Sequence, residues 1–108
     1  IIKYKGKKIS VKARKLNLWG MTRGLMFRTP NCGNLFFDNF SGAIHSWFVF
    51  FDFLGVWMDY DNKAVYSKII RPFSFYIKPK KKFAKLVEIP VNKQNGGLIN
   101  FFVGKRNI

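Results

Sequence analysis

Two apolar runs on either side of a short polar turn constrain the fold of this chain more than any other feature. Residues 56–60 and 63–70 are rich in β-branched and aromatic side chains, and Asp61-Asn62 stands between them. A polar pair of this kind between two apolar runs is typical of a β-hairpin. We therefore expect a central antiparallel pair over these residues, with a further central strand over residues 44–49.

The remaining pattern predicts several short elements along the chain. Within residues 1–13, apolar and polar side chains alternate from Ile9 to Ala13 and Lys5-Gly6-Lys7 can turn, which predicts a hairpin or two short strands. Helical spacing over residues 15–24, ended by a glycine, predicts one short helix. Further strands are expected at residues 34–37, 83–89 and 98–103, with an exposed proline-containing connection at residues 71–82. The pattern indicates a mainly β protein, a small β-sandwich or distorted β-barrel with one short helix.

The length and composition indicate one domain that spans residues 1–108. With 48% apolar residues and 13 Phe, the chain has ample material for a core. We expect much of that core to consist of Trp47, Phe48, Val56, Trp57, Val87 and Phe101. Its longest apolar run, from Trp47 to Met58, is interrupted by Asp52. That run is well short of the ~20 residues of a membrane-spanning helix, so we expect no transmembrane segment. The chain begins at Ile1 rather than at Met, and we expect an upstream segment.

Two motifs resemble the signature of domain-of-unknown-function family 192, a family of small β-rich prokaryotic proteins. The first is Gly-Leu-Met-Phe-Arg at residues 24–28, and the second begins with Ile44-His45 and runs to Val65. Residues 86–90, Leu-Val-Glu-Ile-Pro, are similar to a third family strand. The resemblance covers the chain from about residue 13 to residue 104. It implies a β fold, assigns no activity, and favours export or membrane anchoring.

The chain departs from that family at two acidic positions. Leu54 stands where the family has Asp, and Lys105 follows the closing glycine where Asp is usual. Any role that the family gives to those two carboxylates is therefore not carried over to this chain.

The charge is the second strong signal, because the chain has 20 Lys and Arg against five Asp and Glu, a net charge of +15. Residues 1–30 have a net charge of +9, residues 31–66 of −3, and residues 67–108 of +9. Codon bias toward AT-rich codons explains the many lysines, but it does not explain why the chain has only one Glu. Selection for attraction to an anionic partner would explain this scarcity of acidic residues.

The two basic segments, residues 3–15 and 78–85, also contain aromatic side chains, namely Tyr4, Tyr76 at the border, and Phe83. Lysines interspersed with aromatic rings are typical of proteins that bind single-stranded nucleic acids. A solvated lysine-rich surface gives the same pattern without any ligand. No established nucleic-acid motif accompanies the pattern, so only non-specific affinity is expected.

Catalytic and metal chemistry find little support in the residue types. One His and one Cys are too few for a zinc site, so no metal and no cofactor are expected. Cys32 with His45 as base and Asp59 as orienting group is the one conceivable nucleophilic set, but a hydrogen-bonded structural His with a buried inert thiol is the preferred explanation of those residues. Arg28 can bind a carboxylate or phosphate, or it can pair with Asp59 or Glu88 as a structural tie.

The sequence thus predicts a non-enzymatic binding or accessory module with a basic face for an anionic partner, such as an acidic protein, a surface polymer or lipid head groups. A non-specific nucleic-acid-binding module is the alternative, and a small hydrolase is a distant third. No catalytic residue is assigned. The candidate ligand-binding residues are Arg28, His45, Asp59, Tyr76, Lys78, Lys80, Lys81 and Lys82.

Overall fold

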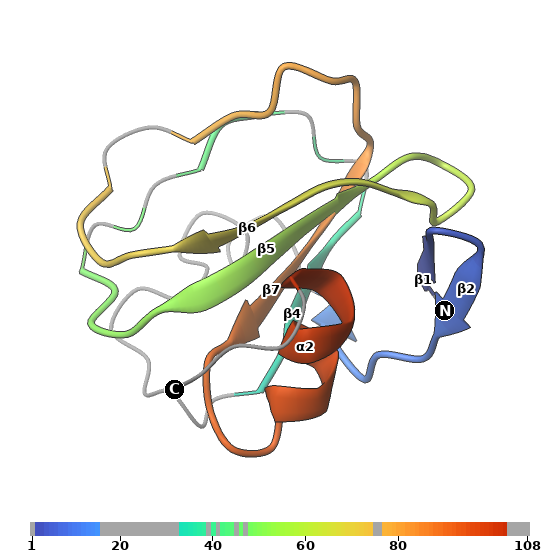
Figure 1. Ribbon diagram of the computed structural model, residues 1–108. Coiled ribbons are helices and arrows are strands. Elements are labelled where there is room, and N and C mark those ends of the chain that lie inside the picture. The colour runs from blue at the N-terminus through green and yellow to red at the C-terminus, as the bar shows by residue number, and fades with distance from the viewer. Residues whose placement is uncertain are drawn as a thin grey trace.

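A long antiparallel hairpin of strands β5 (Phe53–Met58) and β6 (Ala64–Ile70) forms one side of the main sheet of the computed structural model (Figure 1). The structure describes residues 2–15, 33–38, 40, 42–44, 46, 48–74 and 77–103. The hairpin confirms a turn at Asp61-Asn62, where Asn62 has a φ of 63°, but the strands are joined by the five residues 59–63 rather than by these two alone. Asn is one of the few residue types that adopt this left-handed conformation readily.

Strand β5 is an interior strand of a five-stranded sheet with the order β3-β4-β7-β5-β6, in which β6 is an edge strand. Its second neighbour is β7 (Lys85–Pro90), which pairs antiparallel with both β5 and β4 (Leu35–Phe37). Strand β3 (Arg14–Lys15) adds a short parallel edge. A separate hairpin of β1 (Ile2–Tyr4) and β2 (Lys7–Ile9) turns at Lys5-Gly6 as predicted. Across the described residues the sheets do not close into a barrel.

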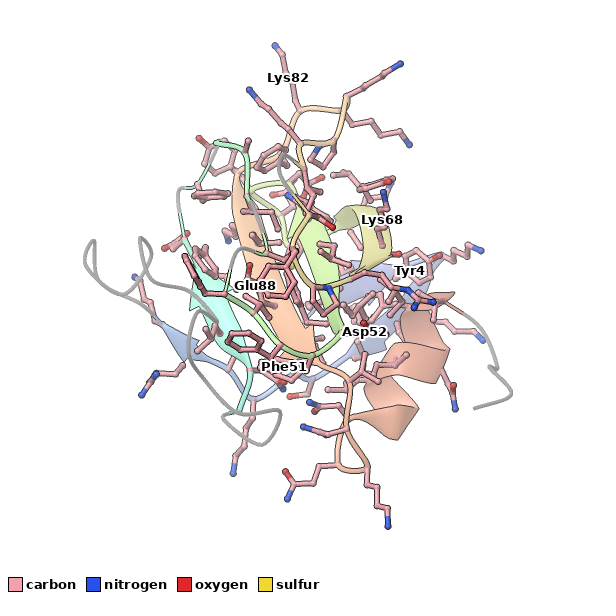
Figure 2. All side chains as sticks on the ribbon, turned by 90° about the vertical axis from the view of Figure 1, so that its left-hand side faces the viewer. Tyr4, Phe51, Asp52, Lys68, Lys82 and Glu88 are labelled. Atoms are coloured by element: carbon pink, nitrogen blue, oxygen red, sulfur yellow. The ribbon has the colours of Figure 1, made fainter. Side chains whose placement is uncertain are left out.

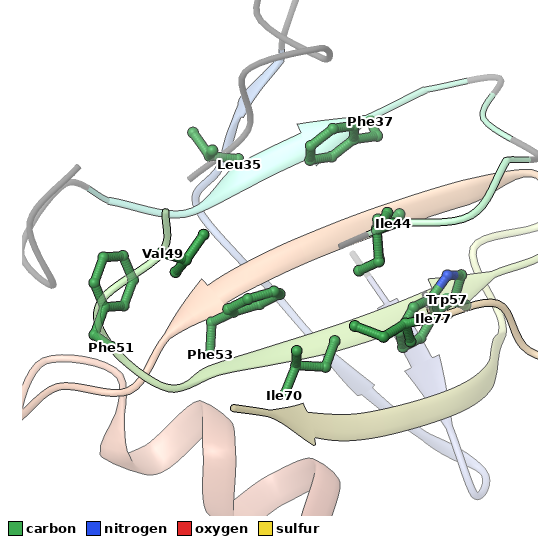
Figure 3. Packing of buried hydrophobic residues seen from close by; sticks show 10 residues of the cluster. Leu35, Phe37, Ile44, Val49, Phe51, Phe53, Trp57, Ile70 and Ile77 are labelled. Atoms are coloured by element: carbon green, nitrogen blue, oxygen red, sulfur yellow. The ribbon is translucent and has the colours of Figure 1, made fainter. Parts of the chain in front are cut away.

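Both faces of the sheet are covered, and every residue of β5 is buried. Because side chains alternate along a strand, Phe53 and Trp57 belong to one core cluster, and Leu54 and Val56 to the other. The first cluster lies under connecting segments that contribute four further residues, Ile44, Val49, Phe51 and Ile77 (Figure 3). Helix α2 (Gly96–Val103) and strand β1 cover the opposite face (Figure 1).

The predicted strand over residues 98–103 is wrong, because these residues form the end of helix α2. Asn95 precedes the helix, and its carbonyl oxygen accepts a hydrogen bond from Ile99 N at 2.9 Å. Ile99 and Phe102, one helical turn apart, are the buried residues of the helix. The helix expected over residues 15–24 lies outside the described residues, apart from Lys15 in β3. Within the described part of the chain, the protein is thus mainly β with one short helix.

The predicted strand over residues 44–49 is also wrong within the described residues. Ile44 forms only an isolated bridge with Ile77. Phe48, expected in the core, has a φ of 58° and a side chain 46% exposed. An extended strand cannot pass through a left-handed residue, so the pairing stops there. The expected core residues Val56, Trp57 and Val87 are buried, Phe101 is half-buried, and Trp47 lies outside the described residues.

Candidate functional site

A groove lined by lysines lies at the turn end of the β5–β6 hairpin. One wall is Asp59 and Tyr60, and the other is the segment from Lys78 to Ala84. The volume of the groove is about 580 Å³. Figure 2 shows Lys82 among side chains that extend away from the body of the protein. We call this feature the lysine groove.

The lysine segment is held at both ends by backbone hydrogen bonds. Ile77 and Ile44 exchange two N–H···O bonds of 2.8 Å, and Ala84 N donates to Met58 O at 2.8 Å. Pro79 is buried between exposed neighbours. The fixed ends leave Lys78, Lys80, Lys81 and Lys82 exposed to solvent. The expectation of an exposed connection over residues 71–82 is thus confirmed for these lysines, whereas Ile77 and Pro79 are buried.

The carboxylate of Asp59 stabilises the turn in the wall of the groove. Its Oδ1 accepts hydrogen bonds from Asp61 N and Lys63 N, both at 2.9 Å. Bonds of this kind are typical of Asp at the start of a turn. One oxygen of this candidate ligand-binding carboxylate is therefore engaged by the turn itself.

Asn62, at the tip of the same turn, joins the two basic parts of the molecule. Its side-chain oxygen accepts a hydrogen bond from Lys85 Nζ at 2.7 Å, and its carbonyl oxygen accepts one from Lys3 N at 2.8 Å. The β1–β2 hairpin therefore packs beside the turn that lines the groove, as Figure 1 also shows. Although they are far apart in sequence, both basic segments flank one acidic turn.

The surface charge of the described residues is strongly one-sided. Every described Lys and Arg is exposed except Lys85, which is half-buried. Among the acids, Asp61 is exposed, Asp38 pairs with Lys15 at 3.3 Å, and Glu88 is buried on β7. An excess of exposed positive charge attracts polyanions over a distance set by ionic strength.

The structure thus brings together five of the candidate residues, Asp59, Lys78, Lys80, Lys81 and Lys82. The other three, Arg28, His45 and Tyr76, lie outside the described residues, as does Cys32. Sequence reasoning missed Tyr60, which is 75% exposed in the wall of the groove. The pattern of lysines interspersed with aromatic rings does not indicate Tyr60, because Tyr60 belongs to the acidic centre of the chain.

The two aromatic residues noted in the basic segments are used for packing. Tyr4 contacts the rings of Phe101 and Phe102, with centroids 5.9 and 5.4 Å away. Phe83 lies 6.2 Å from Phe40 and 6.5 Å from Trp57, again between ring centroids. Among the described aromatic residues that line the groove, Tyr60 is therefore the exposed one.

Neither a metal cluster nor a membrane span emerges from the described residues. They contain no group of three or more His, Cys, Asp and Glu side chains arranged to hold a metal ion. Within the same residues, no helix combines the length and apolar composition needed to cross a membrane. Comparison of the chain with protein-family models, with curated proteins and with solved structures found no match.

Proposed function

We propose that this protein is a non-enzymatic binding module that engages an anionic polymer at the lysine groove. The observation behind the proposal is the set of four exposed lysines on a segment tied at both ends. Because the backbone is held, less of its conformational freedom is lost on binding than in a flexible lysine-rich tail. Membership of domain-of-unknown-function family 192 remains part of the proposal, supported by the matches at residues 24–28 and 44–65.

The residue type also favours a polymer over a small, precisely oriented anion. Lysine is a compact point charge on a flexible stem, whereas the planar fork of arginine suits bidentate recognition of one carboxylate or phosphate. The described residues that line the groove include lysines and no arginine. Such a site attracts repeated negative charges without selecting their geometry, so the binding should depend steeply on salt.

The test is replacement of Lys80, Lys81 and Lys82 together by Gln. Binding to heparin, measured by calorimetry over a series of salt concentrations, should weaken, and the dependence on salt should become shallower. For a single-stranded nucleic acid, the loss of three phosphate contacts should reduce the slope of log K against log salt by about 2.

A matched control separates a localised site from the effect of net charge. Lys12, Lys68 and Lys93 are exposed on three other segments, and their replacement by Gln removes the same total charge. The control variant should retain most of the affinity. Equal losses in the two variants would show that the groove is no site at all.

Single-stranded nucleic acid is a second candidate ligand because of Tyr60. An exposed ring beside lysines allows a base to stack while its phosphates meet the ammonium groups, and stacking on an aromatic side chain contributes about 1–3 kcal/mol per base. In the same titrations, Tyr60→Leu should weaken binding of single-stranded DNA about tenfold or more and leave heparin binding unchanged. Tyr60→Phe, which keeps the ring, should bind like the parent protein. If Tyr60→Leu changes the binding of neither ligand, Tyr60 no longer supports single-stranded nucleic acid as the ligand.

A further inference from the structure

Three exposed phenylalanines gather at the end of the β5–β6 hairpin opposite the lysine groove. Phe48, Phe50 and Phe73 are 46%, 61% and 45% exposed, and the rings of Phe50 and Phe73 meet edge to face with centroids 5.5 Å apart. They belong to the segments that lead into β5 and out of β6, at the left in Figure 1. We call this surface the phenylalanine cap.

Buried Ser46 ties the two segments of the cap together. Its hydroxyl donates to Arg71 O and accepts from Ser74 N, both at 2.6 Å. Its backbone N–H donates to Ser74 O at 2.9 Å, and its carbonyl accepts from Phe73 N at 2.8 Å. Four hydrogen bonds through one fully buried residue hold the segments in register. The rings are therefore presented by an ordered surface.

The outward direction of the rings is built into the backbone. Val49 and Phe51 are buried in the first core cluster, whereas Phe48 and Phe50, which alternate with them, point to solvent. Phe48 and Phe73 have φ values of 58° and 60°, a left-handed conformation that bulky residues rarely adopt. A conformation of this kind persists only where the surrounding contacts enforce it. Here those contacts keep apolar rings exposed instead of adding them to the core.

The charge around the cap decides which partner suits it. Lys68 and Arg71 are exposed beside it, and the nearby acid Asp52 is half-buried. Figure 2 looks onto this end and shows Asp52 close to Phe51, with Lys68 above them. A second copy of a chain with a net charge of +15 would be repelled. An anionic surface with an apolar interior would bury the rings and attract the cationic side chains.

We propose that the phenylalanine cap docks on a lipid bilayer that contains anionic lipids. The three rings enter the boundary between head groups and acyl chains, as apolar side chains of peripheral proteins do. Lys68 and Arg71 remain among the phosphates, where each basic residue adds to the attraction. The site is separate from the lysine groove, so the inference stands or falls independently of the proposed function.

The experiment is co-sedimentation of the protein with vesicles of phosphatidylcholine and phosphatidylglycerol, compared with vesicles of phosphatidylcholine alone. The parent protein should bind the mixed vesicles more strongly. Phe50→Ser should reduce the partition coefficient about tenfold, the effect expected for loss of one ring that is buried on binding. Because the Phe50 ring is mostly exposed, the thermal midpoint of the Phe50→Ser variant should equal that of the parent protein. Phe50→Leu, which keeps an apolar side chain, should retain most of the binding.

Two control variants locate the contact. Tyr60→Ser removes an exposed ring at the other end of the hairpin, and replacement of Lys80, Lys81 and Lys82 by Gln weakens the lysine groove. Both should still bind mixed vesicles better than Phe50→Ser does. The proposal is overturned if the parent protein ignores the vesicles, if Phe50→Ser binds like the parent, or if the lysine variant alone loses binding. It is also overturned if sedimentation velocity shows a dimer that Phe50→Ser dissociates, since the cap would then be a self-association surface.

Discussion

Gly55 and Trp57 share one space on the first face of the sheet. A Cβ atom added at Gly55 would lie 2.7 and 2.8 Å from two ring carbons of Trp57, and 3.2 Å from Ile70 Cδ1. Trp57 is fully buried, so its ring cannot move aside. The absence of a side chain at residue 55 is what allows the indole to lie flat across the strand.

We therefore predict strong coupling between substitutions at these two residues. Trp57→Ala should lower the free energy of unfolding by about 3–5 kcal/mol, since it empties a large buried volume. Gly55→Ala alone should cost about 1–3 kcal/mol through steric overlap. In the Trp57→Ala protein, Gly55→Ala should be nearly neutral, because the ring it would meet is gone. Urea denaturation of the parent protein, the two single variants and the double variant gives the four free energies of unfolding from which the coupling is calculated.

Gly97 supplies the control for this cycle. A Cβ atom there would meet nothing within 4 Å, and the residue lies in helix α2. Gly97→Ala should be neutral or stabilising by up to about 1 kcal/mol, the usual preference of a helix for Ala. If the effects of Gly55→Ala and Trp57→Ala on the free energy of unfolding were strictly additive, the claim that residue 55 and the Trp57 ring compete for one space would be wrong.

Some residue environments followed from the sequence and others did not. The continuous apolar run predicted the burial of Val56 and Trp57 correctly, because an interior strand of a covered sheet has apolar side chains on both faces. Phe48 has the same apolar character, but its left-handed backbone turns the ring to solvent. That conformation is imposed by contacts with residues far away in sequence, such as the hydrogen bond from Phe73 N to Ser46 O. No local pattern encodes it.

At the level of elements, the turn of the β5–β6 hairpin depends on the carboxylate of Asp59. Asp59→Ala removes the acceptor of two backbone hydrogen bonds and should lower the free energy of unfolding by about 1–2 kcal/mol. Asp59→Asn keeps an oxygen in the same place and should lose less. Urea denaturation distinguishes these outcomes. An equal loss in both variants would mean that the negative charge matters, rather than the acceptor geometry.

The elements themselves were predictable where one signal dominated. The Asp61-Asn62 pair located the β5–β6 hairpin, and Pro79 with its neighbouring lysines located the exposed wall of the lysine groove. Helix α2 was missed because Gly96-Gly97 has low helix propensity and suggested a turn before a strand. Packing of Ile99 and Phe102 against the sheet outweighs that propensity. The approach of Tyr60 to the lysines depends on the bond from Ala84 N to Met58 O, which links residues 26 apart in the chain.

For the whole molecule, the excess positive charge should oppose compactness at low ionic strength. The mutual repulsion of exposed lysines destabilises the folded state and is screened by salt. The thermal midpoint should therefore rise as sodium chloride is added from very low to physiological concentration. Calorimetry should show a smaller rise for the protein with Lys80, Lys81 and Lys82 replaced by Gln. A midpoint that falls with salt would indicate that attractive ion pairs dominate instead.

The β5–β6 hairpin also fixes the distance between the two proposed contact regions. Six extended residues of β5 span about 20 Å, with the turn at one end and the phenylalanine segments at the other. The two regions face different directions, so occupation of one leaves the other accessible. A protein anchored by one end would hold its second ligand at a fixed height and raise the local concentration of that ligand. The hairpin would then be a rigid spacer in a bivalent adaptor.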